Sequence, residues 1–401
     1  MSSFNANYIL FDDDSADQLL PLTFTRPVAE LRIGILTIRE KWEKYLGCRC
    51  SYLTRDYLQT KYPAVAGNKN ILVNGSILPA RELVNEIITL KENQVLLKDT
   101  LLLACNIGAQ NPLSFSHNEI DTYVAVQSGS GFTRLDRVWE IFRNNGAEIS
   151  RDFELLTKGR QSGPISESNK VMNPQNVFLE QGAIMECSIV NAVNGPVYIG
   201  REAEVMEGSV IRGALALCDN SVIKVGAKIY GPTTIGPCSK VGGEINNSVI
   251  TGYSNKAHDG YLGNSVIGEW CNIGADSNVS NMKNNYALVK LWDYQKESFS
   301  DTGLQFCGLI MGDHSKCGIN TMFNTGTVVG VSANIFGSGF PRNFIPSFSL
   351  GGAGGFITFS LSEALKVAEI VMSRCHITLT ETDKKILEHV FEKTSKYRRR
   401  K

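Results

Sequence analysis

The sequence from 199 to 241 reads IGREAEVMEGSVIRGALALCDNSVIKVGAKIYGPTTIGPCSKV, and an apolar residue recurs in it at every sixth position. The recurring residues are Ile199, Val205, Ile211, Leu217, Ile223, Ile229, Ile235 and Val241. A helix repeats about every 3.6 residues and a half-buried strand about every two, so neither element produces this period. A period of six is typical of a solenoid built from very short strands and turns. The stretch therefore predicts a β-helix.

The same period continues, with interruptions, after this stretch. It resumes at Val249, fails at Asn255, and then returns at Tyr261, Ile267, Ile273 and Val279, and again at Met311, Cys317, Phe323, Val329 and Ile335. A glycine follows many of these residues, as in Ile235-Gly236, and glycine allows the positive φ that a tight corner needs. With three six-residue faces per coil, we expect a triangular prism about six coils long. Its crossovers are expected to be left-handed, an exception to the usual right-handed rule.

Four segments follow from the pattern. Residues 1–160 lack the period and alternate short apolar runs (8–11, 70–75) with helical patterns (33–46, 80–90), which favours an α/β domain with a largely parallel sheet. A Gly/Ser/Pro-rich linker covers 161–170. The left-handed parallel β-helix is expected over 171–346, with an inserted loop at 281–308. Residues 347–401 are expected to be helical, because 360–363 and 380–383 resemble capping boxes.

Composition excludes several classes of protein. Forty Lys and Arg residues balance forty Asp and Glu residues, so we expect no nucleic acid and no anionic membrane as a partner. The first ten residues do not resemble a leader, and no apolar run is long enough to span a bilayer, so we expect a cytoplasmic protein. The ten cysteines contain no C-x-x-C pair, which favours free thiols over disulfides or a metal site.

His258 is the residue that stands out in the predicted β-helix, in the sequence NKAHDGYLG at 255–263. A neutral imidazole suits a general base near physiological pH. A lone histidine is more often a surface or interface residue without a chemical role, so its neighbours decide the interpretation. The flat walls of a triangular β-helix form no deep pocket within one chain. We therefore expect the active site to lie between the β-helices of adjacent chains in an oligomer.

These neighbours carry a family resemblance. The segments KAHDGYLG (256–263) and IGEWCNIGA (267–275) resemble the H-x-x-Y-[IL]-G and N-I-G-A motifs of the bifunctional N-acetylglucosamine-1-phosphate uridylyltransferase/glucosamine-1-phosphate N-acetyltransferase family. The resemblance implies that His258 is the base that frees the sugar amine to attack acetyl-CoA, and that Glu244 orients it. It further implies two binding sets: Lys224, Asn246, Tyr261 and Asn272 for the amino sugar phosphate, and Asn285, Tyr286 and Lys290 for acetyl-CoA. Asn246 stands where the family has a lysine.

The first domain resembles the sugar-phosphate nucleotidyltransferases. The segment LPLTFTRP (20–27) is similar to their P-L-T-x-x-x-P-K segment, with Val28 at the lysine position. The resemblance implies nucleotide and phosphate binding by Thr23, Arg26 and Arg32, since arginine can clamp phosphate oxygens. DDDSAD (12–17) replaces the glycine-rich loop, and NGS (74–76) resembles an N-G-D whose aspartate binds magnesium. Two interpretations of the three aspartates at 12–14 remain: they bind the metal ion, or they form a solvated acidic turn that binds no metal.

The sequence thus predicts a homotrimeric transferase of sugar-nucleotide biosynthesis for the cell envelope. Acetyl transfer from acetyl-CoA to glucosamine-1-phosphate would be followed by nucleotidyl transfer from UTP or dTTP, with Mg²⁺, to give UDP-N-acetylglucosamine. One alternative is a nucleotidyltransferase whose β-helix only holds the trimer together. The other is a non-catalytic assembly protein that binds sugar nucleotides.

Overall fold

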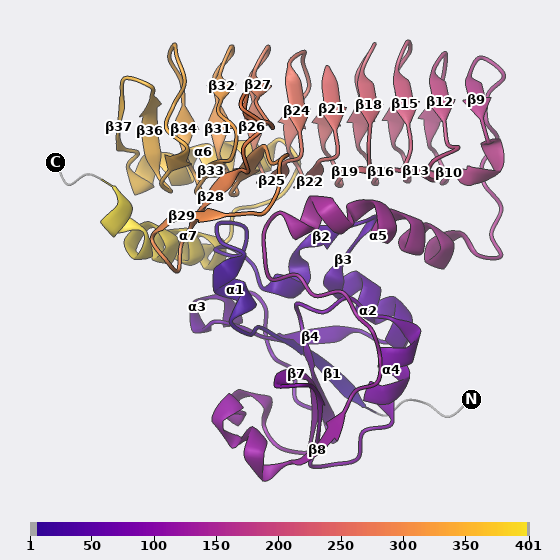
Figure 1. The fold of residues 1–401 in the computed structure, drawn as a ribbon, viewed down its shortest axis with the longest axis vertical. Helices are drawn as coiled ribbons and strands as arrows, with labels where there is room; N and C mark the ends of the chain where they lie inside the picture. Colours follow the sequence, from indigo (N-terminus) through magenta and orange to yellow (C-terminus); the bar gives the residue numbers. More distant parts are fainter. Residues whose placement is uncertain (1–5, 399–401) are drawn as a thin grey trace. The chain divides into compact units, whose positions relative to one another are not determined.

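The computed structural model describes residues 6–398, which form two compact units (Figure 1). Within this range the first unit consists of 6–19, 25–31 and 36–136. The second consists of 20–24, 32–35 and 137–398. Two short segments of the N-terminal part of the chain therefore belong to the second unit.

The first unit is built on a six-stranded sheet in the order β4-β1-β5-β7-β6-β8. Its strands are β1 Asn7–Phe11, β4 Cys50–Leu53, β5 Asn70–Asn74, β6 Gln94–Lys98, β7 Leu101–Gly108 and β8 Val124–Gln127. β1 is parallel to β4 and β5, but β7 is antiparallel to both β5 and β6. The expected largely parallel sheet is therefore mixed. The cause is the two-residue connection between β6 and β7, which can join only antiparallel strands.

Short helices connect these strands: α1 Ser15–Gln18, α2 Ile38–Leu46, α3 Asp56–Gln59 and α4 Arg81–Ile88, with 3₁₀ turns at Val28–Glu30, Pro112–Ser114 and His117–Thr122. The helix expected over 33–46 begins later than predicted, because Arg32–Ile33 (β2) and Leu36–Thr37 (β3) are extended. Thr37 caps α2 in a full capping box with Glu40, and Gly47 ends it with φ 70°.

The second unit begins its main run with α5 (Glu140–Thr157) and continues into a β-helix with three walls. The first wall has nine parallel strands: β10 Val177–Leu179, β13 Val197–Ile199, β16 Leu215–Leu217, β19 Thr233–Ile235, β22 Val249–Gly252, β25 Val266–Glu269, β30 Leu309–Met311, β33 Thr327–Val329 and β35 Phe344–Ile345. The second wall has ten: β11 Ile184–Met185, β14 Glu204–Val205, β17 Val222–Ile223, β20 Lys240–Val241, β23 Asn255–Lys256, β26 Asn272–Ile273, β31 Lys316–Cys317, β34 Asn334–Ile335, β36 Ser349–Gly352 and the antiparallel β37 Gly355–Thr358.

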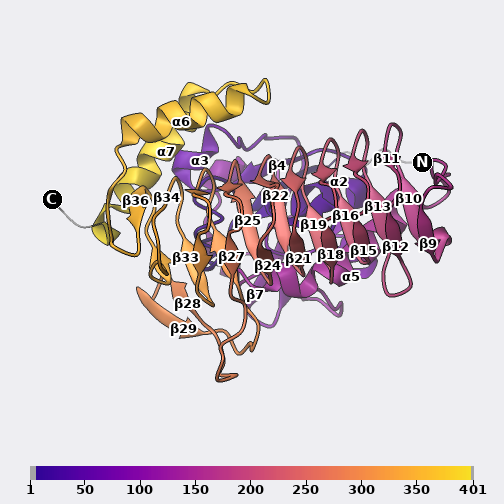
Figure 2. The same cartoon turned by 90° about the horizontal axis from the view of Figure 1, so that it is seen from above.

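The third wall is made of two sheets. The longer one holds β9 Lys170–Met172, β12 Ile189–Asn191, β15 Val210–Arg212, β18 Lys228–Tyr230, β21 Glu244–Asn246 and β24 Tyr261–Gly263. The shorter one pairs β27 Asn278–Val279 with β32 Met322–Phe323. Figures 1 and 2 show the coils side by side in a single row.

The number of coils differs from the expectation. Register pairs Val197 with Leu215 and Leu215 with Thr233, so a regular coil takes eighteen residues. The walls of nine and ten strands exceed the six coils expected, because the repeat region is long enough for more coils of this size.

The inward positions also differ where the sequence period slips. Ile235 pairs with Ile250, not with Val249, and Val241 pairs with Lys256. The coil from Val241 to Lys256 therefore has fifteen residues instead of eighteen. Leu262, with 1% of its surface exposed, takes the inward place that the period assigned to Tyr261. The sequence period fails near Asn255 because the inward residue of this coil is Lys256, although the coil itself is complete.

The inserted segment 281–308 contains an antiparallel hairpin, β28 (Lys290–Asp293) and β29 (Ser298–Asp301). Trp292 stacks on Phe344 with ring centroids 4.1 Å apart, and Tyr294 lies 5.7 Å from Tyr397. The hairpin is therefore packed against the last coils and the C-terminal segment of its own unit.

Two helices, α6 (Leu361–Ser373) and α7 (Glu381–Lys393), follow the β-helix and lie along one flank of the coils (Figure 2), and a 3₁₀ turn at Ser395–Tyr397 comes after them. Ser360 caps α6, and Thr380 forms the predicted capping box at α7. The predicted fold class is confirmed: an α/β domain, a parallel β-helix and C-terminal helices. The exact domain boundaries stay predictions.

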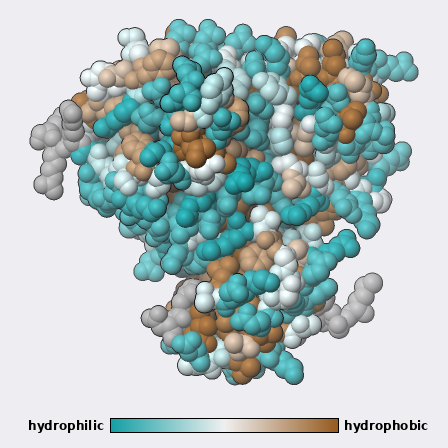
Figure 3. All heavy atoms as spheres, in the orientation of Figure 1, coloured by the Kyte–Doolittle hydropathy of each residue, from teal (hydrophilic) through white to brown (hydrophobic). Residues whose placement is uncertain are grey.

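The surface carries no extended apolar region on the face drawn in Figure 3, where apolar patches alternate with polar ones. Among the helices of residues 6–398, none has the length and hydropathy that a membrane span requires.

Candidate functional site

His258 lies on the corner, 257–260, between β23 on the second wall and β24 on the third. Gly260 makes this corner with φ 107°, and a Cβ there would lie 2.1 Å from the carbonyl oxygen of Ser277, so only glycine fits. The His258 side chain is exposed. Its imidazole has no hydrogen-bond partner within residues 6–398, so both ring nitrogens are available to a ligand.

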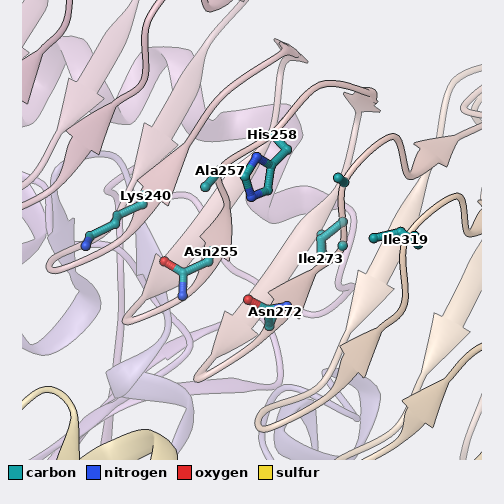
Figure 4. A pocket seen from close by; sticks show the side chains of 9 residues that line it. Lys240, Asn255, Ala257, His258, Asn272, Ile273 and Ile319 are labelled. Carbon is teal, nitrogen blue, oxygen red and sulfur yellow. The ribbon is translucent and has the colours of Figure 1, made fainter.

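Two hollows meet at His258. The first has a volume of about 430 Å³ and is lined by Lys240, Asn255, Ala257, His258, Asn272, Ile273, Gly274, Ala275 and Ile319 (Figure 4). The second has about 330 Å³ and is lined by Val225, Gly242, Gly243, Ala257, His258, Asp259, Ala275 and Asp276. Because both linings include His258, a molecule in either hollow lies beside the same imidazole.

A row of polar side chains crosses the first hollow. Lys240 is opposite Asn255, and Asn255 is opposite Asn272, on three successive coils of the second wall. The residue after each one points inward, so these three point outward, as Figure 4 shows. The structure thus brings the predicted Asn272 together with His258. Sequence reasoning missed Lys240 and Asn255, because the three residues are spaced by fifteen and seventeen residues and a regular coil of eighteen does not align them.

Glu244 and Tyr261 lie opposite each other on the third wall, beyond the corner. The carboxylate of Glu244 accepts a hydrogen bond from the Tyr230 hydroxyl at 2.5 Å. Burial, and then this bond, raise the pKa of Tyr230. The hydroxyl of Tyr261 accepts from the Asn281 amide at 3.0 Å. Within the described residues no bond joins Glu244 to His258, so its orienting role stays a prediction.

Two further sugar-site residues lie near the hollows or on the third wall. The Cβ of Lys224 is 3.3 Å from where a Cβ on Gly242 would stand, so this lysine adjoins the second hollow. Asn246 lies on β21, opposite Gly263. Their part in binding stays a prediction.

The three residues predicted for acetyl-CoA lie in the inserted segment. Tyr286 is 64% exposed, Asn285 accepts a bond from the Ala287 amide at 3.1 Å, and Lys290 pairs with Asp301 at 3.6 Å. Among the described residues that line the two hollows, none of these three occurs. The structure does not bring them together with His258 in one chain.

The second candidate region lies in the first unit, where β1 and β5 end side by side at Phe11 and Asn74. Ligands of α/β folds commonly bind at the carboxyl ends of parallel strands. Here Asp13 accepts hydrogen bonds from the Asn74 amide and from Arg134, both at 2.8 Å, and from Ser15. Burial alone would raise the pKa of Asp13, but the bonds from Ser15 and Asn74 and the charge of Arg134 hold it below its usual value.

These residues do not fit a magnesium ion. Mg²⁺ requires oxygen ligands that can turn toward it. The lone pairs of Asp13 are taken by its neighbours, and Asp12 accepts from the Val28 amide and the Thr54 hydroxyl. Burial raises the pKa of Asp12 to about 6. Ser76 accepts from Arg134 at 3.3 Å, and no cluster of three or more His, Cys, Asp or Glu suited to a metal occurs in the described part of the chain.

The predicted phosphate-binding residues are buried and divided between the units. Thr23 and Arg32 belong to the second unit and Arg26 to the first. Arg32 donates to the Thr251 carbonyl at 3.1 Å and to the Ile35 carbonyl, so it binds backbone of its own unit. Phosphate binding by these three residues stays a prediction.

Comparison with known proteins bears on both units. Residues 8–161 match the family described as sugar nucleotidyl transferase. This segment is therefore similar to sugar nucleotidyl transferase domains. The chain is also 24% identical over 387 residues to a bifunctional sugar-1-phosphate nucleotidylyltransferase/acetyltransferase of Sulfurisphaera tokodaii, covering 80% of this chain and 94% of that one.

Two further similarities are shorter or weaker. The bifunctional protein GlmU of Methanocaldococcus jannaschii is 36% identical over 87 residues, covering 22% of this chain and 21% of its own. The solved UDP-N-acetylglucosamine acyltransferase of Arabidopsis is 17% identical, with a TM-score of 0.26, and the match covers 53% of this chain and 80% of that one. Along most of its length, the chain is thus similar to a bifunctional transferase.

Proposed function

We propose that this chain is a bifunctional transferase of sugar-nucleotide biosynthesis. The β-helix transfers an acetyl group from acetyl-CoA to an amino sugar 1-phosphate, with glucosamine-1-phosphate as the first candidate. The first unit transfers a nucleotidyl group to the sugar 1-phosphate, giving UDP-N-acetylglucosamine from UTP. The similarity to a bifunctional relative over 80% of the chain supports the pairing of the two activities.

The observation that carries the acetyl transfer is the place of His258 between two hollows. Each has the size of a small-molecule site. With the amino sugar in one and the thioester in the other, the amine nitrogen attacks the thioester carbonyl, and His258 takes the proton that the amine loses. The C–N bond forms, the C–S bond breaks, and the leaving thiolate takes the proton from the imidazolium. General-base catalysis of this kind contributes about 10²- to 10⁴-fold.

The polar row in the first hollow suits the acceptor. The Lys240 ammonium can pair with the phosphate, while the amides of Asn255 and Asn272 can bond sugar hydroxyls. On the same side of the coils, Val225 and Ile319 leave 68% and 71% of their surfaces exposed beside the hollows. A second copy of the chain would cover these side chains, which supports the predicted homotrimer.

The first unit would bind a sugar 1-phosphate and a nucleoside triphosphate. A phosphate oxygen of the sugar attacks the α-phosphorus, and pyrophosphate leaves. Because the carboxylates at the strand ends do not fit a magnesium ion, no step of this transfer is assigned to a metal held by the protein. The base of the nucleotide, and a cytoplasmic location for the enzyme, stay predictions.

The test is thiol release from acetyl-CoA in the presence of glucosamine-1-phosphate. We expect the variant His258→Ala to lose at least 100-fold in rate with the oligomer intact. His376→Ala, which removes an exposed histidine between α6 and α7, is the matched control and should keep the rate. Unchanged release in His258→Ala would refute the assignment.

A second candidate function is nucleotidyl transfer alone, with the β-helix as a scaffold. The match of residues 8–161 to the sugar nucleotidyl transferase family favours it. In that case the wild type would release pyrophosphate from UTP or dTTP with a sugar 1-phosphate, but no thiol with any amino sugar phosphate. Binding of sugar nucleotide without either release would instead indicate a non-catalytic assembly protein.

A further inference from the structure

A lysine lies inside the β-helix directly behind the His258 corner. Lys256 is opposite Val241 on the preceding coil and has 2% of its surface exposed. The neighbouring coils place Ile223, Val241 and Ile273 at the same inward position, and all three belong to the apolar core. Lys256 is therefore a cation in a column of aliphatic side chains.

The ammonium of Lys256 is fully used by backbone. Its Nζ donates to the carbonyl oxygens of Gly242 at 3.1 Å, His258 at 2.5 Å and Asp259 at 3.2 Å. An ammonium has three donors, so each proton has one partner. Two of the acceptors belong to the corner that carries the imidazole, and the third belongs to the corresponding corner of the preceding coil.

Packing does not account for this residue. An aliphatic side chain would fill the column as it does in the other coils, whereas a buried charge costs free energy unless it is well bonded. Desolvation lowers the pKa of Lys256 to about 8, against the opposing effect of the nearby charge of Asp259 and then Asp276. What the ammonium adds is directional: three bonds that converge on two adjacent corners.

We propose that Lys256 is a positioning residue that holds the His258 corner in the geometry required for acetyl transfer. By binding the carbonyls of residues 258 and 259 from inside the prism, it fixes the backbone from which the imidazole projects between the two hollows. The proposal rests on the proposed role of His258 as the base. The amides of Glu244 and Asp276 donate to the carbonyls of Gly260 and Asp259, so the corner also connects the coils on either side.

The first test measures the corner itself, by amide hydrogen exchange in the full-length protein. We expect Lys256→Met to speed exchange about tenfold or more at Glu244, Tyr261 and Asp276, with the melting temperature showing a folded chain. The matched control is Lys316→Met. Lys316 is half-buried, and its Nζ donates to the His314 carbonyl at 3.0 Å, on a different corner. This control should leave exchange at the His258 corner unchanged.

The second test measures catalysis. We expect Lys256→Met to lower kcat for thiol release at least tenfold with little change in the KM for acetyl-CoA, and Lys316→Met to keep kcat. In the wild type the rate should also fall above about pH 8, as the ammonium loses its charge, and this fall should be absent in Lys256→Met.

The outcomes separate the two proposals. Unchanged exchange at the corner in Lys256→Met would overturn the inference, and so would faster exchange with an unchanged kcat. If the wild type releases no thiol with any amino sugar phosphate, the proposed acetyl transfer fails, and with it the positioning role. The exchange data would then still show whether Lys256 holds this corner.

Discussion

The buried ammonium of Lys256 makes the stability of the β-helix depend on pH in an unusual direction. Its pKa is about 8 in the folded chain and 10.5 when exposed. Between these values the unfolded chain binds more protons than the folded chain, so the free energy of unfolding rises as pH rises through this window. The contribution is fully present above pH 10.5 and is lost as pH falls through 8.

The size of the effect follows from the difference in pKa. At about 1.4 kcal/mol per unit, it amounts to about 3 kcal/mol in full, most of it gained between pH 7 and pH 10. No discount for solvent screening applies, because only 2% of the side chain is exposed. Other groups also titrate in this range, so the informative quantity is the difference between the wild type and Lys256→Met.

The assay is urea unfolding of both proteins at several pH values from 7 to 10. We expect the wild type to gain about 2 to 3 kcal/mol relative to Lys256→Met over this range. Lys228→Met, which removes an exposed lysine on the third wall, should give a curve parallel to the wild type. Parallel curves for the wild type and Lys256→Met would refute the reasoning, since they would mean that the Lys256 pKa is the same in both states.

Three further perturbations test other parts of the structure. Arg134→Met should destabilise the first unit by about 1 to 3 kcal/mol, because a hydrogen-bonded carboxylate, Asp13, loses its charged partner, and urea unfolding should show a transition at lower urea. Gly260→Ala should lower the rate of thiol release at least tenfold with the oligomer intact, since a methyl group there meets the Ser277 carbonyl; a normal rate would contradict the tight corner. Ile229→Ala should cost about 2 to 5 kcal/mol by urea unfolding, because it leaves a cavity in the fully buried column; a loss below 1 kcal/mol would mean that the coil collapses onto it.

Much of the fold could be predicted from the sequence because the β-helix is a local structure. Each coil contacts mainly its neighbours, and a core residue at every sixth position defines which side chains face inward. The prediction was wrong where coils shorten. One coil has fifteen residues instead of eighteen, and Ile250 rather than Val249 faces inward in it. A fixed period of six therefore did not predict that Lys256 lies inside the β-helix.

The candidate site divides in the same way. His258 and Asn272 could be singled out because a short motif contains both. Lys240 and Asn255 could not be singled out in this way. They line the first hollow together with Asn272 only because the register pairs Lys240 with Asn255, fifteen residues later, and Asn255 with Asn272, seventeen residues later. In the first unit, the sequence left the triple aspartate open as a metal site. What the structure adds is that Asp13 already accepts bonds from Ser15, Asn74 and, from 121 residues away, Arg134.

By itself, then, the sequence determined the β-helix and drew attention to His258, because periodicity and short motifs depend on neighbours along the chain. Only the tertiary structure decided which side chains surround that residue and which charges are already paired. Those contacts join residues on different coils and strands, and their partners depend on coil length and register, which no local pattern records.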